Sequence, residues 1–178
     1  KKFDLPPENI LLNLYKITDE LLNNAQLKKY EVSNYARKNA KCDHNLRVWQ
    51  GAEYCGIGPG AHGRIIIDKK WFATHKYSSP KVWLNKSLEK KSTLYKNIEI
   101  PPIERAQEIL LTGLRINNGI NIGELFVKLQ IDNSDLILDK KEVVNLKKLN
   151  LITAEDAILK VTKKGFPVLN YIINKLII

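Results

Sequence analysis

The sequence has 178 residues, of which 44% are hydrophobic, and its formal net charge is +10. This length suits one ordinary domain or two small ones, and the hydrophobic content suffices for a core, which excludes a disordered chain. No apolar run approaches the ~20 residues that a membrane-spanning helix needs, and the first nine residues contain no secretory signal. We therefore expect a soluble protein of the cytoplasm.

The positive charge is spread along the whole chain. Only five of the 29 cationic residues are arginines, and lysines occur in every segment. Clustered cations favour nucleic acid because they release phosphate counterions, whereas scattered lysines are typical of a solvated surface. The charge alone therefore does not indicate a nucleic-acid-binding protein.

The first part of the chain combines one helix with short strands. Apolar residues at helical spacing predict a helix over residues 10–22, which follows a Pro-Pro-Glu start and ends near Asn23. A strand over 28–32 comes next, and such a helix-then-strand step builds α/β barrels or doubly wound sheets. Because the chain begins with Lys1, contains no Met and enters almost at once on a loop, we expect it to be a piece of a larger protein.

Glycine and polar residues dominate residues 37–64, which predicts loops around a short apolar segment at 54–57. A strand over 64–67 turns at Asp68, and aromatic residues continue it after the turn. A surface helix is predicted over 80–91.

The pattern changes at Pro101 and Pro102, after which compact helices are predicted. The expected elements are helices over 103–115, 122–129 and 141–149, strands over 151–153 and 158–162 joined by a turn at 154–157, and a last helix over 166–177. Three helices, a hairpin and a closing helix follow the order of a winged-helix domain. We therefore expect two domains, residues 1–100 and 101–178.

Much of the unusual chemistry lies in residues 41–64. The segment Gly-Ile-Gly-Pro-Gly-Ala-His-Gly over residues 56–63 lets the backbone turn sharply and present N–H groups to a flat or anionic ligand. It matches neither the phosphate-binding pattern nor the dinucleotide fingerprint, so a plain tight turn beside a strand is the simpler interpretation.

His44 is the better candidate of two histidines for binding iron. Asp43 or Asn45 would orient its ring, and Trp49 would supply an aromatic wall for a flat ligand. The alternative is a solvated loop histidine that caps a turn. His62 is explained equally well by packing in a glycine turn.

Neither cysteine indicates a metal site. Cys42 and Cys55 are too far apart for the usual metal-binding pair, no third cysteine exists, and both are expected to stay reduced. The sequence also shows no serine elbow and no paired carboxylates, so it provides no catalytic residue.

Three motifs, taken in order, resemble the HemW family. They are YEVSNYA at residues 30–36, HNLRVW at 44–49 and GIGPGAH at 56–62, and the tail from Glu104 through Gly113-Leu114-Arg115 resembles the C-terminal domain of that family. HemW proteins are radical SAM proteins similar to oxygen-independent coproporphyrinogen III oxidase. The resemblance implies an α/β chain (α+β overall), with the terminal portion of a partial (β/α) barrel followed by a small winged-helix-like domain.

The resemblance also implies cofactors and a function. In that family the barrel carries a [4Fe–4S] cluster and S-adenosylmethionine, but this sequence lacks the cysteine triplet and the early glycine-rich segments that hold them. The strand around Glu31 would be the last of the parallel set and would deliver the His44 loop to the mouth of the barrel. The function implied is that of a haem chaperone, which binds haem and passes it to acceptor proteins.

Site residues follow from the same resemblance. His44 would bind the haem iron, with Asn45 and Trp49 beside the macrocycle. The residues implied near S-adenosylmethionine in the full-length family are Gly56, Ile57, Gly58 and Gly60. Val48 stands where the family motif has tyrosine, so any contact from that phenol is missing.

Three other interpretations remain open. The chain could be the tail of a porphyrinogen-oxidising radical enzyme, where it would wall the active site and dock propionates through Lys and Arg. A nucleic-acid-binding winged helix would use Lys140, Lys141, Lys147, Lys148, Lys163 and Lys164, but it leaves the first hundred residues unexplained. Finally, the chain could need its missing barrel portion as a partner, because Ile10, Leu14 and Val32 would otherwise be uncovered.

Overall fold

The computed structural model describes residues 4–178 and begins with one long helix. This helix, α1 (Glu8–Asn24), starts after Pro7 with Glu8 in its first turn, as the sequence predicted. It contributes no buried residue, and Ile10, Leu14 and Ile17 are 46%, 51% and 50% exposed. An apolar face of α1 is therefore uncovered in this chain.

The strand predicted over residues 28–32 is shorter than expected and pairs within this chain. Strand β1 (Lys28–Lys29) pairs antiparallel with β2 (Tyr35–Ala36), and Glu31 forms an antiparallel bridge with Ile116. A turn explains this pairing. The Glu31 carboxylate accepts hydrogen bonds from the Ser33 backbone N–H (2.8 Å) and hydroxyl (3.0 Å), and the turn they stabilise reverses the direction of the chain.

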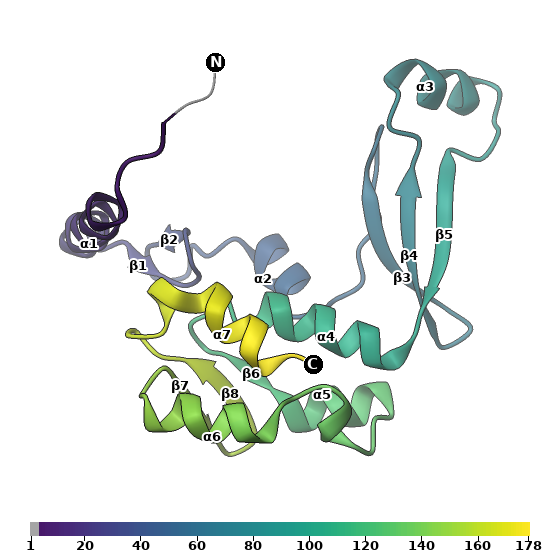
Figure 1. Ribbon diagram of the computed structural model, residues 1–178. Helices are drawn as coiled ribbons and strands as arrows, with labels where there is room; N and C mark the ends of the chain where they lie inside the picture. The colour runs from purple at the N-terminus through teal and green to yellow at the C-terminus, as the bar shows by residue number, and fades with distance from the viewer. Residues whose placement is uncertain (1–3) are drawn as a thin grey trace.

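A three-stranded antiparallel sheet stands away from the rest of the chain (Figure 1). Its order is β3 (His62–Ile67), β4 (Lys70–Lys76) and β5 (Leu94–Ile100), and α3 (Pro80–Leu88) lies at the far end between β4 and β5. The turn at Asp68 is confirmed, and positive φ angles at Asp68 (48°) and Lys69 (65°) define a tight two-residue hairpin. Strand β5 was not predicted, because most of its residues are polar or exposed and only pairing with β4 holds it.

The C-terminal part contains the expected helices and hairpin in the expected order. Its elements are α4 (Pro102–Gly113), β6 (Ile120–Asn121), α5 (Ile122–Leu129), the 3-10 turn Ser134–Leu136, α6 (Lys140–Lys148), β7 (Ile152–Glu155), β8 (Ile158–Val161), the 3-10 turn Phe166–Val168 and α7 (Leu169–Leu176). The unpredicted strand β6 pairs with β8, which gives a sheet of order β6-β8-β7. The hairpin turn is shorter than predicted and consists of Asp156 and Ala157.

The hydrophobic core lies almost entirely in this C-terminal part. Its fully buried side chains include Leu110, Ile137, Ile172 and Leu176 from two helices and a connecting segment. Among residues 4–100, only Trp71 and Ile100, at the base of the three-stranded sheet, join this cluster as buried residues. The sheet is therefore anchored at one end and extends outward from it (Figure 1).

Candidate functional site

The residues of the HNLRVW motif form a helix, not the loop that the sequence predicted. Helix α2 (Asp43–Trp49) begins with Asp43 in its first turn, and nothing in its sequence breaks a helix before Gly51. His44, Asn45, Val48 and Trp49 lie on one side of it, since residues four apart share a helix face. His44 is exposed, whereas the other three are half-buried. We call these four residues the α2 patch.

Helix α2 is fixed to α4 through its C-terminal end. The Thr112 hydroxyl donates to the Trp49 carbonyl oxygen (3.1 Å), and the Arg105 guanidinium donates to the Gly51 carbonyl oxygen (3.0 Å). Gly51 has φ +76°, and a Cβ there would lie 2.5 Å from the Ile109 side chain. Only glycine therefore lets the chain leave α2 at this distance from α4.

A charged cluster that the sequence analysis missed joins the same region to the three-stranded sheet. Arg64 on β3 donates twice to the Glu108 carboxylate, at 3.0 and 2.7 Å, and Arg105 donates to it at 3.0 Å. Arg105 is only 4% exposed and stacks on Trp71, 4.1 Å from the ring centroid. The sequence contained one signal of this cluster. Arg105 and Glu108 are three positions apart on a predicted helix, and arginines are few in this chain.

The cluster shifts the pKa values of its members. Hydrogen bonds from Arg64 are the largest of the effects that lower the pKa of Glu108, and with Arg105 they outweigh burial, which would raise it. Burial lowers the pKa of Arg105 despite the nearby carboxylate. Glu108 is therefore an anion held between two cations.

Acid should weaken the contact that Glu108 makes between α4 and the three-stranded sheet. Because the pKa of Glu108 is lowered from 4.5, its contribution to stability is complete above pH 4.5 and is lost as the pH falls through the folded-state value. We expect the thermal midpoint of unfolding to fall as the pH is lowered below 4.5, and to fall less in a Glu108→Gln variant. Differential scanning calorimetry across this range tests it, and parallel curves for the two proteins would contradict it.

The glycines of residues 56–63 have a structural explanation. A Cβ on Gly56 would lie 2.3 Å from the His62 carbonyl oxygen, and one on Gly63 would lie 2.5 Å from the Thr74 hydroxyl. Gly60 has φ +71° and donates its N–H to Tyr77 at 2.9 Å. Gly58 differs, because its φ is +102° with open space around it, and the neighbouring Ile57 is 88% exposed.

Two histidines stack on the three-stranded sheet, and the sequence analysis singled out only one of them. His62 and His75 are cross-strand partners whose rings lie 4.1 Å apart and nearly parallel, with Tyr95 edge-on to His75 at 5.8 Å. Only the register of β3 and β4 brings them together. Cys42 and Cys55 are both exposed thiols, and residues 4–178 contain no group of three or more His, Cys, Asp or Glu that could hold a metal ion.

The α2 patch and the glycine segment do not meet in three of the best-formed clefts of the described residues. Neither His44 nor residues 56–60 line any of these three clefts. In Figure 1, α2 packs on the helical C-terminal part, while the segment after it leads away to the sheet.

The fold defined by these elements matches part of a solved structure. The solved structure of coproporphyrinogen III oxidase (HemN) from Escherichia coli, a radical SAM enzyme, matches 98% of this chain with a TM-score of 0.71. The sequence identity is 16%, and the match covers 42% of the oxidase chain. The mixed α/β class predicted from the sequence is confirmed.

Sequence comparison then identifies the family. Residues 100–168 match the HemN C-terminal domain. The chain is 43% identical over 65 residues to Heme chaperone HemW of Buchnera aphidicola subsp. Acyrthosiphon pisum, which covers 36% of this chain and 17% of that protein. The resemblance to the HemW family is thus confirmed, and the chain is similar both to HemW proteins and to the HemN C-terminal domain.

Mitochondrial relatives are also similar. "Radical S-adenosyl methionine domain-containing protein 1, mitochondrial" is 32% identical over 125 residues in Danio rerio, covering 67% of this chain and 28% of that protein. The Bos taurus protein of the same name is 28% identical over 97% of this chain and 40% of its own length. The chain thus spans between about a quarter and two fifths of these two relatives. Among residues 4–178, no helix is long and apolar enough to cross a membrane.

Proposed function

We propose that this protein binds haem through the α2 patch and hands it to acceptor proteins. The observation that carries the proposal is His44 on the exposed side of α2 with Val48 and Trp49 one turn further along. An accessible imidazole beside apolar side chains is what a haem iron and its macrocycle require. The relatives named heme chaperone add support.

The residues of the patch have distinct roles in this proposal. His44 supplies a ring nitrogen to the haem iron, and Asn45 lies next to it to orient the ring or the haem edge. Trp49 offers an aromatic surface that excludes water from one side of the macrocycle. Val48 adds apolar area but no hydrogen-bonding group, so we expect weaker binding than a tyrosine there would give.

The chain's own residues do not fit a [4Fe–4S] cluster. Such a cluster takes several thiolates, and this chain has two cysteines, Cys42 and Cys55, thirteen positions apart. We therefore derive no radical step from these residues. In a longer protein, Gly56, Ile57, Gly58 and Gly60 would lie against S-adenosylmethionine, a proposal supported by the open backbone at Gly58.

The same proposal includes the architecture of the chain. We propose that it divides into residues 1–100, which are the end of a barrel, and residues 101–178, which form a winged-helix-like domain.

Nucleic-acid binding by the second part has little support. Lys140 pairs with Asp135, and Lys147 and Lys164 donate to the Ala154 and Leu149 carbonyl oxygens (3.1 and 3.0 Å). These lysines thus stabilise the domain itself.

Haem titration tests the proposal. We expect the chain to give a Soret band typical of a histidine ligand, and His44→Ala to raise the haem dissociation constant about tenfold or more, since an iron ligand is lost. Val48→Tyr should lower it. His62→Ala is the matched control, because it removes another exposed histidine outside the α2 patch. An unchanged band in His44→Ala, or its loss only in His62→Ala, would refute the assignment.

A further inference from the structure

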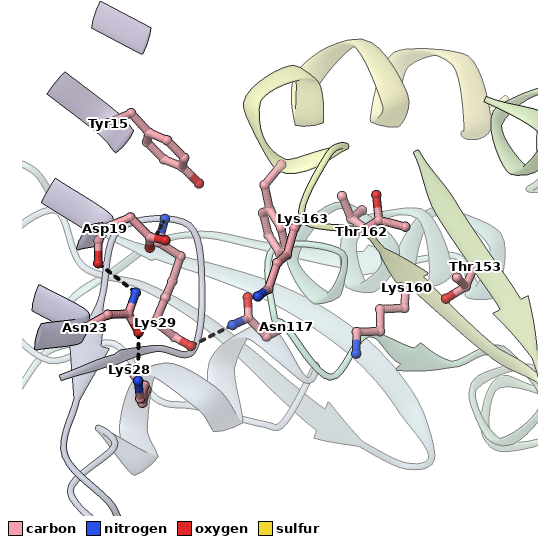
Figure 2. A pocket seen from close by; sticks show the side chains of 12 residues that line it. Tyr15, Asp19, Asn23, Lys28, Lys29, Asn117, Thr153, Lys160, Thr162 and Lys163 are labelled. Carbon is pink, nitrogen blue, oxygen red and sulfur yellow. Dashed lines mark hydrogen bonds and ion pairs between the residues drawn. The ribbon is translucent and has the colours of Figure 1, made fainter. Parts of the chain in front are cut away.

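A cleft of about 590 Å³ separates the N-terminal helix from the hairpin of the C-terminal part. One wall is formed by Tyr15, Asp19 and Asn23 of α1 with β1, and the other by the β7–β8 hairpin and the residues after it (Figure 2). Asn117 lies between the walls. The volume is that of an ordinary small-molecule site.

The cleft carries a strong excess of positive charge. Lys28, Lys29, Lys160 and Lys163 line it together with a single carboxylate, that of Asp19, which gives a net charge of +3. Cations gathered in a concave surface repel one another and focus a positive potential into it. Figure 2 shows these lysines entering from both walls.

The two lysines of β1 are already engaged. Lys29 is 11% exposed, forms an ion pair with Asp19 (3.1 Å) and lies 3.8 Å from the centroid of the Tyr15 ring. Burial alone would lower the pKa of Lys29, but hydrogen bonds to Tyr15, Tyr35 and Asp19 raise it overall, so this cation is permanent. Lys28 donates to the Asn23 side-chain oxygen at 3.1 Å.

The lysines of the hairpin wall are available. Among residues 4–178, no ion pair engages Lys160 or Lys163, and both are exposed to the cleft. Lys160 is the direct cross-strand partner of Thr153, whose hydroxyl also lines the cleft. The charge of Lys163 contributes to the lowered pKa of Asp19, which places it within electrostatic reach of the opposite wall.

Asn117 lines the cleft and is fixed to β1. Its side-chain N–H donates to the Lys29 carbonyl oxygen at 2.6 Å (Figure 2), which fixes the amide in place. Its Oδ1 is buried and has no hydrogen-bond partner within the described residues.

We propose that this cleft binds a small, multiply charged anion. Lys160 and Lys163 bind its anionic oxygens through charge-assisted hydrogen bonds. Phosphates and carboxylates both present such oxygens, so either could supply the ligand. The site is separate from the α2 patch and does not rest on the haem proposal.

Isothermal titration calorimetry at roughly physiological ionic strength tests this with two probes, fructose 1,6-bisphosphate and citrate, which carry hydroxyls beside phosphates or carboxylates. We expect saturable binding of at least one of them, and the one that binds more tightly identifies the anionic group. The double variant Lys160→Gln/Lys163→Gln should raise the dissociation constant about tenfold or more, and Lys160→Arg/Lys163→Arg should largely retain it.

The matched control removes the same charge elsewhere. Lys148→Gln/Lys175→Gln changes two exposed lysines outside the cleft and should alter the dissociation constant less than about twofold. All variants should keep the parent thermal midpoint without ligand, since these side chains are exposed. Equal weakening by both glutamine pairs, or no saturable binding of either probe, would overturn the proposal.

Discussion

Replacing Glu108 by alanine should lower the free energy of unfolding by about 2–4 kcal/mol, because it leaves the buried cation of Arg105 without a counter-charge. Arg105 is 4% exposed, and Arg64 would lose both of its bonds to the same carboxylate. We expect an effect in the lower part of the range for buried pairs, since the Glu108 side chain is itself 35% exposed. Urea unfolding followed by circular dichroism measures it.

The control for this substitution lies on the same helix. Glu104→Ala removes an exposed carboxylate from the first turn of α4 and should cost less than about 1 kcal/mol. Equal losses for the two variants would show that Glu108 acts only as a helix residue. A selective loss would identify the Arg64–Glu108–Arg105 cluster as the junction between the outer sheet and the C-terminal core.

Gly51→Ala should destabilise the protein by about 2–4 kcal/mol, since the new methyl group meets a buried side chain and the backbone conformation disfavours it. The Cβ would lie 2.5 Å from Ile109, which is 2% exposed, and the φ of Gly51 is +76°. Relief of the clash would move α2 away from α4. The α2 patch should therefore lose haem affinity along with stability.

The substitution Gly58→Ala separates the cost of the steric clash from the cost of the backbone conformation. Gly58 also has positive φ (+102°), but a Cβ there would meet nothing within 4 Å, so only the conformational cost of about 1 kcal/mol remains. Thermal unfolding of both variants, with haem titration of Gly51→Ala, provides the measurement. A Gly58→Ala loss as large as that of Gly51→Ala would show that close packing on Ile109 is unimportant.

The α2 patch illustrates how far a motif predicts a site. His44, Asn45 and Trp49 were chosen as neighbours in the sequence, and the helix does place them on one side. Their loop conformation was wrong, because the prediction relied on nearby glycines and polar residues and overlooked an unbroken stretch over residues 43–49. Hydrogen bonds from Thr112 and Arg105, more than fifty positions away, hold the end of this helix.

Local patterns by themselves determined most of the helices of this protein and one of its hairpin turns. The helix over 122–129 coincides with α5, and α1, α4 and the turn at Asp68 were recognised because side-chain periodicity and turn residues act over a few positions. The resemblance to the HemW family was also carried by sequence motifs.

Only the tertiary structure decided how distant segments meet. The antiparallel direction of β1, the existence of β5, the cluster around Glu108 and the lysine-lined cleft all depend on residues far apart in the chain. Lys29 and Lys163 look alike in the sequence and line the same cleft, yet Lys29 is half-buried and paired with Asp19 whereas Lys163 is exposed. Burial and pairing set the chemistry of each charge, and neither is encoded at the position itself.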